Sequence, residues 1–227
     1  MLRAFADLGF RWKIALPIML LAALLVAMGA LGMRGITQVA ESSTTLTNRH
    51  LPAISLLLNA DRDLYQAFVA ERSLLDEDSA AHAEKLRAYH AENLQQAYDR
   101  VHKFAATQPG SEALALVAEF DRGFERWKAT SLRVLELARS DPGAASRLSF
   151  ADSEAQFNEA RSAIDKLGEM EDSAANAVGT GAISRGEALA WQQGLLIAIG
   201  LLVCLVLVVG FPLLVTRPLH SLLHRIE

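Results

Sequence analysis

Residues 14–33 read IALPIMLLAALLVAMGALGM, and residues 194–215 read GLLIAIGLLVCLVLVVGFPLLV. Neither run contains a charged residue. An α-helix rises about 1.5 Å per residue, so a helix of about 20 residues crosses the roughly 30 Å of hydrocarbon in a bilayer. The two runs therefore predict transmembrane helices over residues 14–36 and 194–215. The first run could instead be a signal peptide cleaved near Ala27, although it is longer than the usual apolar core of about 7–15 residues.

Basic residues at the outer edges of the two runs predict how the chain is oriented. They are Arg3, Arg11, Lys13, Arg217 and Arg225. Because Lys and Arg near a span remain on the cytoplasmic side, residues 1–13 and 216–227 are predicted to be cytoplasmic and residues 37–193 to lie outside. The outer segment carries 16 Lys and Arg against 24 Asp and Glu. With this acidic balance nucleic acid is not expected as a partner, whereas the lipid bilayer is.

Proline and glycine divide the outer segment into helices. The clearest breaks are Asp141-Pro142-Gly143 and Gln108-Pro109-Gly110, because proline cannot continue a helix and glycine readily ends one. A weaker break lies at residues 76–79. Apolar residues recur at spacings of three and four between the breaks, which predicts helices over residues 37–77, 80–107, 111–139 and 152–193. We therefore predict an all-α fold, an antiparallel up-down-up-down four-helix bundle flanked by two transmembrane helices.

Glycine recurs near the end of the fourth predicted helix, at Gly179, Gly181 and Gly186. Each glycine weakens an α-helix by roughly 1 kcal/mol relative to alanine. One interpretation is a close approach between helices, where a side chain would not fit. The other interpretation is a soft stretch that lets the fourth helix slide or twist.

Charged residues interrupt the apolar stripes of two predicted helices. Asp61 and Arg72 lie on the stripe of the first helix, and Arg161 lies on that of the fourth. If these antiparallel helices leave the membrane at one height, residues whose numbers sum to about 230 lie level with each other. Arg161 is then expected close to the height of Arg72, and counting through the turns brings Arg133 near the same layer.

Arginines at one height could clamp a small anion, since the guanidinium group matches carboxylate or phosphate with paired hydrogen bonds. We predict an anion site shared between the first and fourth helices at a dimer interface. The candidate ligand-binding residues are Arg62, Tyr65, Gln66, Arg72, Asn158 and Arg161. The alternative is that Arg72 pairs with Glu71, Asp61 or a partner subunit and only fixes the register of the helices.

The histidines favour structural roles. His90 falls on the core stripe of the second helix with Leu86 and Leu94, which is more typical of a hydrogen-bonded core residue than of a metal or haem ligand. His82, His90 and His102 lack the i, i+4 pairing that would place zinc on one helix face. No glycine-rich phosphate loop, nucleophile elbow or pair of catalytic carboxylates occurs in the sequence. We therefore predict no metal, no cofactor and no enzymatic activity.

The sequence Thr216-Arg217-Pro218-Leu219 directly follows the second apolar run. Its Pro-Leu pair resembles the opening of a HAMP linker, whose first helix begins with such a pair just inside the membrane. Leu222, Leu223 and Ile226 then continue an apolar stripe. Residues 216–227 are accordingly predicted to be the start of such a linker.

The stretch Asn59–Ala67, with Ala70 and Glu71 after it, is similar to a subgroup of methyl-accepting chemotaxis proteins with a four-helix-bundle ligand domain. The resemblance covers residues 1–227. It implies a homodimer in the bacterial inner membrane, with the bundle in the periplasm. It also implies a small ligand-induced displacement of the fourth helix and control of a histidine kinase through cytoplasmic partners. Such receptors bind amino acids, organic acids or phosphate, which implies a small anionic ligand.

Three functions follow from this architecture. The first is the sensor module of a chemoreceptor, either the sensory half of a longer chain or a truncated receptor. The second is the same input region feeding a membrane histidine kinase or a diguanylate cyclase, because HAMP linkers serve those enzymes too. The third is a non-sensory membrane bundle that binds a periplasmic protein. The sequence after Glu227 distinguishes the first two: a long heptad hairpin favours chemotaxis, and a kinase or cyclase domain favours the alternative.

Overall fold

The structure, a computed structural model, describes residues 9–76, 81–107 and 110–223. Every regular element in these ranges is a helix, which confirms the predicted all-α class. The elements are α2 (Phe10–Thr45), the π-helical turn η1 (Leu46–His50), α3 (Leu51–Ser73), α4 (Ala83–Thr107), α5 (Ser111–Ser140), α6 (Pro142–Leu148), the π-helical turn η3 (Ser149–Ser153) and α7 (Glu154–Leu223). The chain divides into two compact units, Ser43–Gly179 and Met1–Ser42 with Thr180–Glu227.

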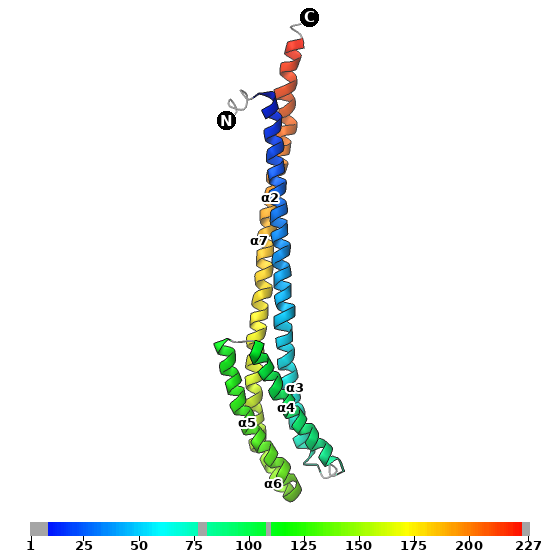
Figure 1. Ribbon diagram of the computed structural model, residues 1–227, viewed down its shortest axis with the longest axis vertical. Helices are drawn as coiled ribbons and strands as arrows, with labels where there is room; N and C mark the ends of the chain where they lie inside the picture. Colours follow the sequence, from blue (N-terminus) through cyan, green and yellow to red (C-terminus); the bar gives the residue numbers. More distant parts are fainter. Residues whose placement is uncertain (1–8, 77–80, 108–109, 224–227) are drawn as a thin grey trace. The chain divides into compact units, whose positions relative to one another are not determined.

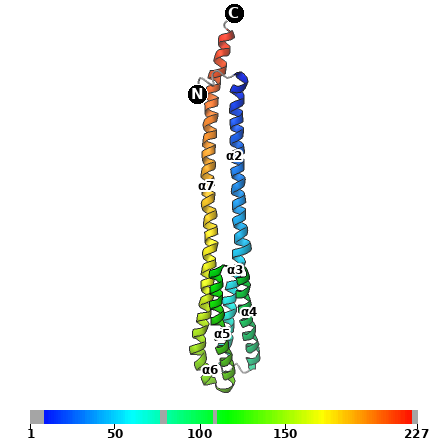
Figure 2. The same ribbon diagram turned by 60° about the vertical axis from the view of Figure 1, so that its left-hand side comes forward.

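The unit Ser43–Gly179 is a four-helix bundle. Figures 1 and 2 show α3, α4, α5 and the run from α6 into α7 lying side by side. Consecutive helices are joined by short connections, so neighbouring helices run antiparallel, as the sequence predicted. The predicted limits of α4 and α5 agree with the structure to within one helical turn.

The fourth helix of the bundle begins earlier than predicted. We expected residues 143–151 to lie outside a helix, but α6 starts at Pro142 and continues through η3 into α7. The side chain of Asp141 caps this helix, because its Oδ1 accepts a hydrogen bond from the backbone N–H of Ala144 at 2.9 Å. Pro142 occupies the first helical position, where a missing N–H costs nothing. The Asp-Pro-Gly break therefore ends one helix and starts the next without an intervening loop.

Aromatic side chains fill the centre of the bundle. The largest fully buried ones are Phe104, Phe120, Phe124 and Trp127. Helices α5 and α7 approach each other closely at Gly123, where an added Cβ would lie 3.1 Å from the Cα of Ala160. Glycine at this position lets two backbones meet, so α5 and α7 form a tight pair in the described core.

The unit formed by α2 and the C-terminal part of α7 is strongly apolar. The helical run Ile14–Ser73 contains a window of mean hydropathy 2.6, and the run Pro142–Gly210 contains one of 2.7, and neither window is buried. By length and composition, both helices are compatible with membrane spans. The limits 14–36 and 194–215 stay predictions, and residues 224–227 of the predicted linker lie outside the described residues.

The glycines of α7 do not mark a close approach within this chain. An added Cβ at Gly179 or Gly186 would meet nothing within 4 Å, and at Gly181 it would meet only the side chain of Arg185. A close approach does occur at Gly32 of α2, where the added Cβ would lie 3.2 Å from the Nε2 of Gln193. Both interpretations of the α7 glycines, a close approach between helices and a soft stretch, stay predictions.

Candidate functional site

Arg161 of α7 forms an ion pair with Asp61 of α3 through two hydrogen bonds. Its Nε donates to Asp61 Oδ1 at 2.6 Å, and its Nη2 donates to Asp61 Oδ2 at 3.2 Å. The hydrogen bond to Asp61 and the negative charge of that carboxylate raise the pKa of Arg161. Both oxygens of the carboxylate accept from the same guanidinium, so the charges of this pair cancel.

Arg72 of α3 is held at a different place, beside η3 and the start of α7. Its Nη2 donates to Glu154 Oε2 at 2.8 Å and to the carbonyl oxygen of Ser149 at 3.2 Å. The guanidinium also lies 4.7 Å from the ring centroid of Phe68 and 3.7 Å from that of Phe150. Contacts with two aromatic faces and one carboxylate fix this side chain in position.

The predicted layer of three arginines is wrong. Arg161 lies opposite Asp61, whereas Arg72 lies opposite Glu154, and Asp61 and Arg72 are about 16 Å apart along α3 at 1.5 Å per residue. Arg133 bonds Glu136 of its own helix at 2.9 Å and is exposed. The height estimate failed because α3 and α7 do not share the assumed register. The predicted alternative, pairing of Arg72 with Glu71, Asp61 or a partner subunit, is right that Arg72 pairs with a carboxylate, but within this chain that carboxylate is Glu154.

The other predicted ligand-binding residues are distributed over several faces. Tyr65 is 52% exposed on the outer side of α3, with its ring centroid 6.1 Å from that of Phe157. Asn158 is exposed on α7, and Gln66 is half-buried on α3. Arg62 is half-exposed, and it donates to Asp63 of its own helix. The structure therefore does not bring the six predicted residues into one site.

Two arginines converge on Asp63, a residue that the sequence analysis did not select. Asp63 is fully buried, and its Oδ1 accepts from Arg62 Nε at 3.0 Å and from Arg62 Nη2 at 2.7 Å. Its Oδ2 accepts from Arg100 Nε of α4 at 2.5 Å. We call these three residues the Asp63 layer. A signal was available in the sequence, because Asp63 lies at helical spacing from the buried Ala60, Ala67 and Ala70.

A second buried carboxylate of α3 is held by hydroxyl groups. Glu71 is fully buried, and it accepts from Ser149 Oγ at 2.5 Å and from Ser153 Oγ at 2.8 Å. Trp127 Nε1 donates to the same Ser153 Oγ at 3.1 Å. We call these four residues the Glu71 layer. Its two serines lie on the turn η3, which the sequence analysis had placed in a loop.

The buried histidines form single polar contacts inside the bundle. His90 is fully buried with its Nε2 2.7 Å from Ser131 Oγ, which confirms the predicted core role. Burial, together with the charge of Arg87, lowers the pKa of His90 to about 4. His50 on η1 lies 2.6 Å from Glu171 of α7, and both side chains are buried. Within the described ranges no group of three or more His, Cys, Asp or Glu side chains could hold a metal ion.

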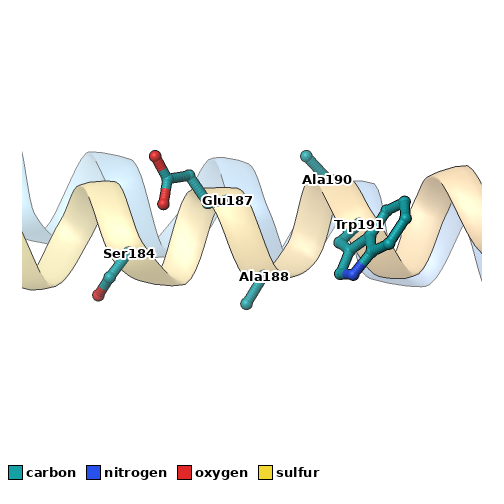
Figure 3. Close-up of a pocket in the computed structure, with 5 residues that line it drawn as sticks. All are labelled: Ser184, Glu187, Ala188, Ala190 and Trp191. Atoms are coloured by element: carbon teal, nitrogen blue, oxygen red, sulfur yellow. The ribbon is translucent and has the colours of Figure 1, made fainter.

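A shallow depression on α7 lies outside the bundle. It is lined by Ser184, Glu187, Ala188, Ala190 and Trp191. Figure 3 shows that all five residues come from one helix, with Glu187 and Ala190 on one side of its ribbon and Ser184 and Ala188 on the other. Trp191 is 82% exposed. This surface lacks the convergent polar groups of a binding site, so the candidate site lies among the polar layers of the bundle.

The structure combines a four-helix bundle with two helices that are long and apolar enough to be compatible with membrane spans. The family described as a four helix bundle sensory module for signal transduction matches residues 7–183. This is more than half of the chain, which therefore belongs to that family, a module typical of chemoreceptors. The comparisons with curated proteins and with solved structures gave no significant match.

Proposed function

We propose that the chain is the sensor module of a transmembrane chemoreceptor, which binds a small ligand outside the cytoplasm and signals through displacement of α7. The family match supports sensing as the general role. The observation that carries the mechanism is the continuity of α7, a single helix from Glu154 to Leu223 that contains both bundle-core residues and the second apolar run. A helix of this kind can transmit a shift along its axis without an intervening joint.

The location follows the predicted orientation. The bundle faces the periplasm of a bacterium, the two apolar helices cross the inner membrane, and the residues after the second span begin a HAMP linker. The partners on the cytoplasmic side are a histidine kinase and its adaptor. The alternative output is a membrane histidine kinase or a diguanylate cyclase with the same input region, and the type of output domain distinguishes them.

A homodimer is supported by the outer face of α3. Leu51, Leu58 and Tyr65 follow each other at seven-residue spacing and are 59%, 67% and 52% exposed, and Val69 beside them is 44% exposed. A seven-residue apolar repeat on a helix surface is the pattern of a coiled-coil contact. A second copy presents the same stripe, so the two α3 helices can pack together about a two-fold axis.

A small anion is the proposed ligand class, such as an organic acid, an amino acid or inorganic phosphate. Arginine side chains that are accessible at the bundle surface support this class. Arg161 and Arg72 support it less than Arg62 does, because each of them is already paired with its own carboxylate. An anion that replaced Asp61 or Glu154 would leave that carboxylate unpaired next to the incoming negative charge.

The ligand can move α7 only through a difference in affinity between two helix arrangements. The segment of α7 with buried Phe157, Ile164 and Leu167 is fixed in the core. The stretch from Gly179 to Gly186 lacks neighbours at both of these glycines and is the proposed soft part. Because α7 is unbroken through this stretch, these glycines would let the helix slide or twist together with its core segment.

Cysteine cross-linking tests the proposed function. Pairs of cysteines placed at the bundle-side ends of the two apolar runs, in the full chain in nanodiscs, are oxidised with and without ligand. The Cys204→Ser background removes the native thiol. Ligands are first identified by a thermal-shift panel of phosphate, malate, serine and an uncharged sugar, since a ligand that binds only the folded state raises the melting temperature. Cross-linking rates should change with the best ligand. Unchanged rates at saturation, for every pair, would exclude the sliding mechanism.

A further inference from the structure

We propose that Arg62 and Arg100 form a binding site for a small oxyanion at the surface where α3 packs against α4, with Asp63 as the buried carboxylate that orients both guanidinium groups. The inference rests on the proposed function, whose ligand it places at named residues. It moves the site away from the α3–α7 face, where the sequence analysis had predicted it.

The first argument is the balance of charge. Asp63 supplies one negative charge, whereas Arg62 and Arg100 supply two positive ones. The pairs Asp61–Arg161 and Glu154–Arg72 each combine one acid with one base. The Asp63 layer therefore keeps an uncompensated positive charge, and an anion can bind there without displacing any carboxylate.

The second argument is the number of unused hydrogen-bond donors. A guanidinium has five N–H groups. Arg100 donates to Asp63 through Nε, which leaves both of its terminal nitrogens for a ligand. Arg62 donates to Asp63 through Nε and Nη2, which leaves Nη1. Terminal nitrogens from two arginines match the paired oxygens of a carboxylate or a phosphate.

The third argument is burial. The side chain of Asp63 is 0% exposed, that of Arg100 is 31% exposed and that of Arg62 is 53% exposed. The carboxylate thus lies beneath the two guanidinium groups, which are accessible from solvent in the single chain. Arg62 also lies one turn from Leu58 and from Tyr65, on the α3 stripe of the proposed homodimer. A buried carboxylate that fixes two accessible arginines pre-organises them, which lowers the entropy lost when an anion binds.

The surrounding side chains favour a small, partly solvated oxyanion. Gln66 lies one turn after Arg62 on α3, and Lys103 lies one turn after Arg100 on α4, so an amide and a further positive charge lie near the two arginines. Two acids of α4 precede Arg100, and both accept hydrogen bonds from glutamine amides, Glu92 from Gln96 at 2.9 Å and Asp99 from Gln95 at 2.8 Å. Phosphate and short dicarboxylates have the charge that two arginines and a lysine favour.

Calorimetric titration of the full chain in nanodiscs tests the site. Inorganic phosphate and malate are titrated separately at about pH 7, with potassium chloride holding the ionic strength constant. The variant Arg100→Gln should bind the better anion at least about tenfold more weakly than the wild type. Arg62→Gln should weaken binding in the same direction. The matched control is Arg126→Gln, because Arg126 is a half-exposed arginine paired with Glu159 on other helices of the bundle. Its affinity should stay within about twofold of wild type.

Each outcome decides the inference. Equal affinities of wild type and Arg100→Gln would overturn it, and so would a loss of binding confined to Arg161→Gln, which would place the anion on the α3–α7 face. Absence of phosphate and malate binding to the wild type would also overturn the inference. The proposed function would still be tested separately, by cysteine cross-linking in the presence of serine or the sugar. If Arg100→Gln melts far below the wild type without anion, Arg100→Lys is used instead. Lysine keeps a positive charge beside Asp63 but lacks the paired N–H donors of arginine, so the anion should bind several-fold more weakly than to the wild type.

Discussion

Helix α3 carries two fully buried carboxylates, Asp63 and Glu71, and their hydrogen-bond partners differ in charge. In the Asp63 layer, two guanidinium groups share one carboxylate. In the Glu71 layer, about 12 Å further along the helix, two serine hydroxyls and no described cation serve the carboxylate. The first arrangement leaves positive charge at the surface, and the second leaves none. Burial of an acidic residue in a bundle is therefore no guide to whether its surroundings can bind an anion.

The largest expected effect is the loss of folding stability at low pH caused by protonation of His90. It fixes the pH at which the two layers are compared. Its pKa is about 4 in the folded chain and 6.5 as the reference value, so the unfolded state binds more protons between these values. Stability should be complete above about pH 6.5 and fall by roughly 3 kcal/mol as the pH approaches 4. Urea unfolding followed by circular dichroism measures this decline. In His90→Gln the decline should be much smaller, and an identical decline would contradict the assignment to His90.

Asp63→Asn should cost about 2 kcal/mol of stability, because two arginines lose the charge that they share. Asparagine keeps the shape of the side chain but points an amide group at a guanidinium on one side. Urea unfolding at about pH 7, above the His90 transition, measures the loss. A change smaller than about 0.5 kcal/mol would show that the two arginines hydrate without cost and that Asp63 does not orient them.

Ser153→Ala should cost about 1.5 kcal/mol, because it leaves both Glu71 and the indole N–H of Trp127 one partner short in the core. Tryptophan fluorescence provides a second measurement, since the surroundings of Trp127 change. The matched control is Ser184→Ala on α7, where the hydroxyl is exposed and bonds only to its own helix. That variant should unfold like the wild type.

Glu71→Gln should have the smallest effect, about 0.5 kcal/mol. Serine hydroxyls can donate or accept, so Ser149 and Ser153 can rotate to suit an amide. The same change from carboxyl to amide is thus expected to be several times less costly at Glu71 than at Asp63. Equal losses at the two positions would mean that the comparison between arginine and serine partners has no energetic basis.

The fold was largely predictable from local sequence signals. Apolar spacing identified α4 and α5, and the two Pro-Gly pairs identified the turns that bound α5. The start of α6 was missed because Asp141-Pro142 can end a loop or cap a helix, and the choice depends on packing of the residues that follow. The π-helical turns were missed because they arise from tertiary packing and have no propensity signal of their own.

The candidate site was less predictable than the fold. Asp61 and Arg161 were both recognised as charged residues on core stripes, but their pairing was not, because partners on different helices depend on the relative height of those helices. Arg100 had no signal on its own, since an arginine at an intermediate position of a helix is ordinarily solvated. Its significance appears only when α4 brings it to Asp63.

The turn η3 has a consequence for comparing this chain with its relatives. Ala145, Ser149, Ser153 and Phe157 are all buried at steps of four, although such steps drift by about 40° each around an α-helix. A π-helical turn holds one additional residue, and that residue offsets most of the accumulated rotation. One inserted amino acid in an ancestral α-helix would therefore have delivered both hydroxyls to Glu71. Homologues that are one residue shorter here should carry an uncharged side chain in place of that glutamate.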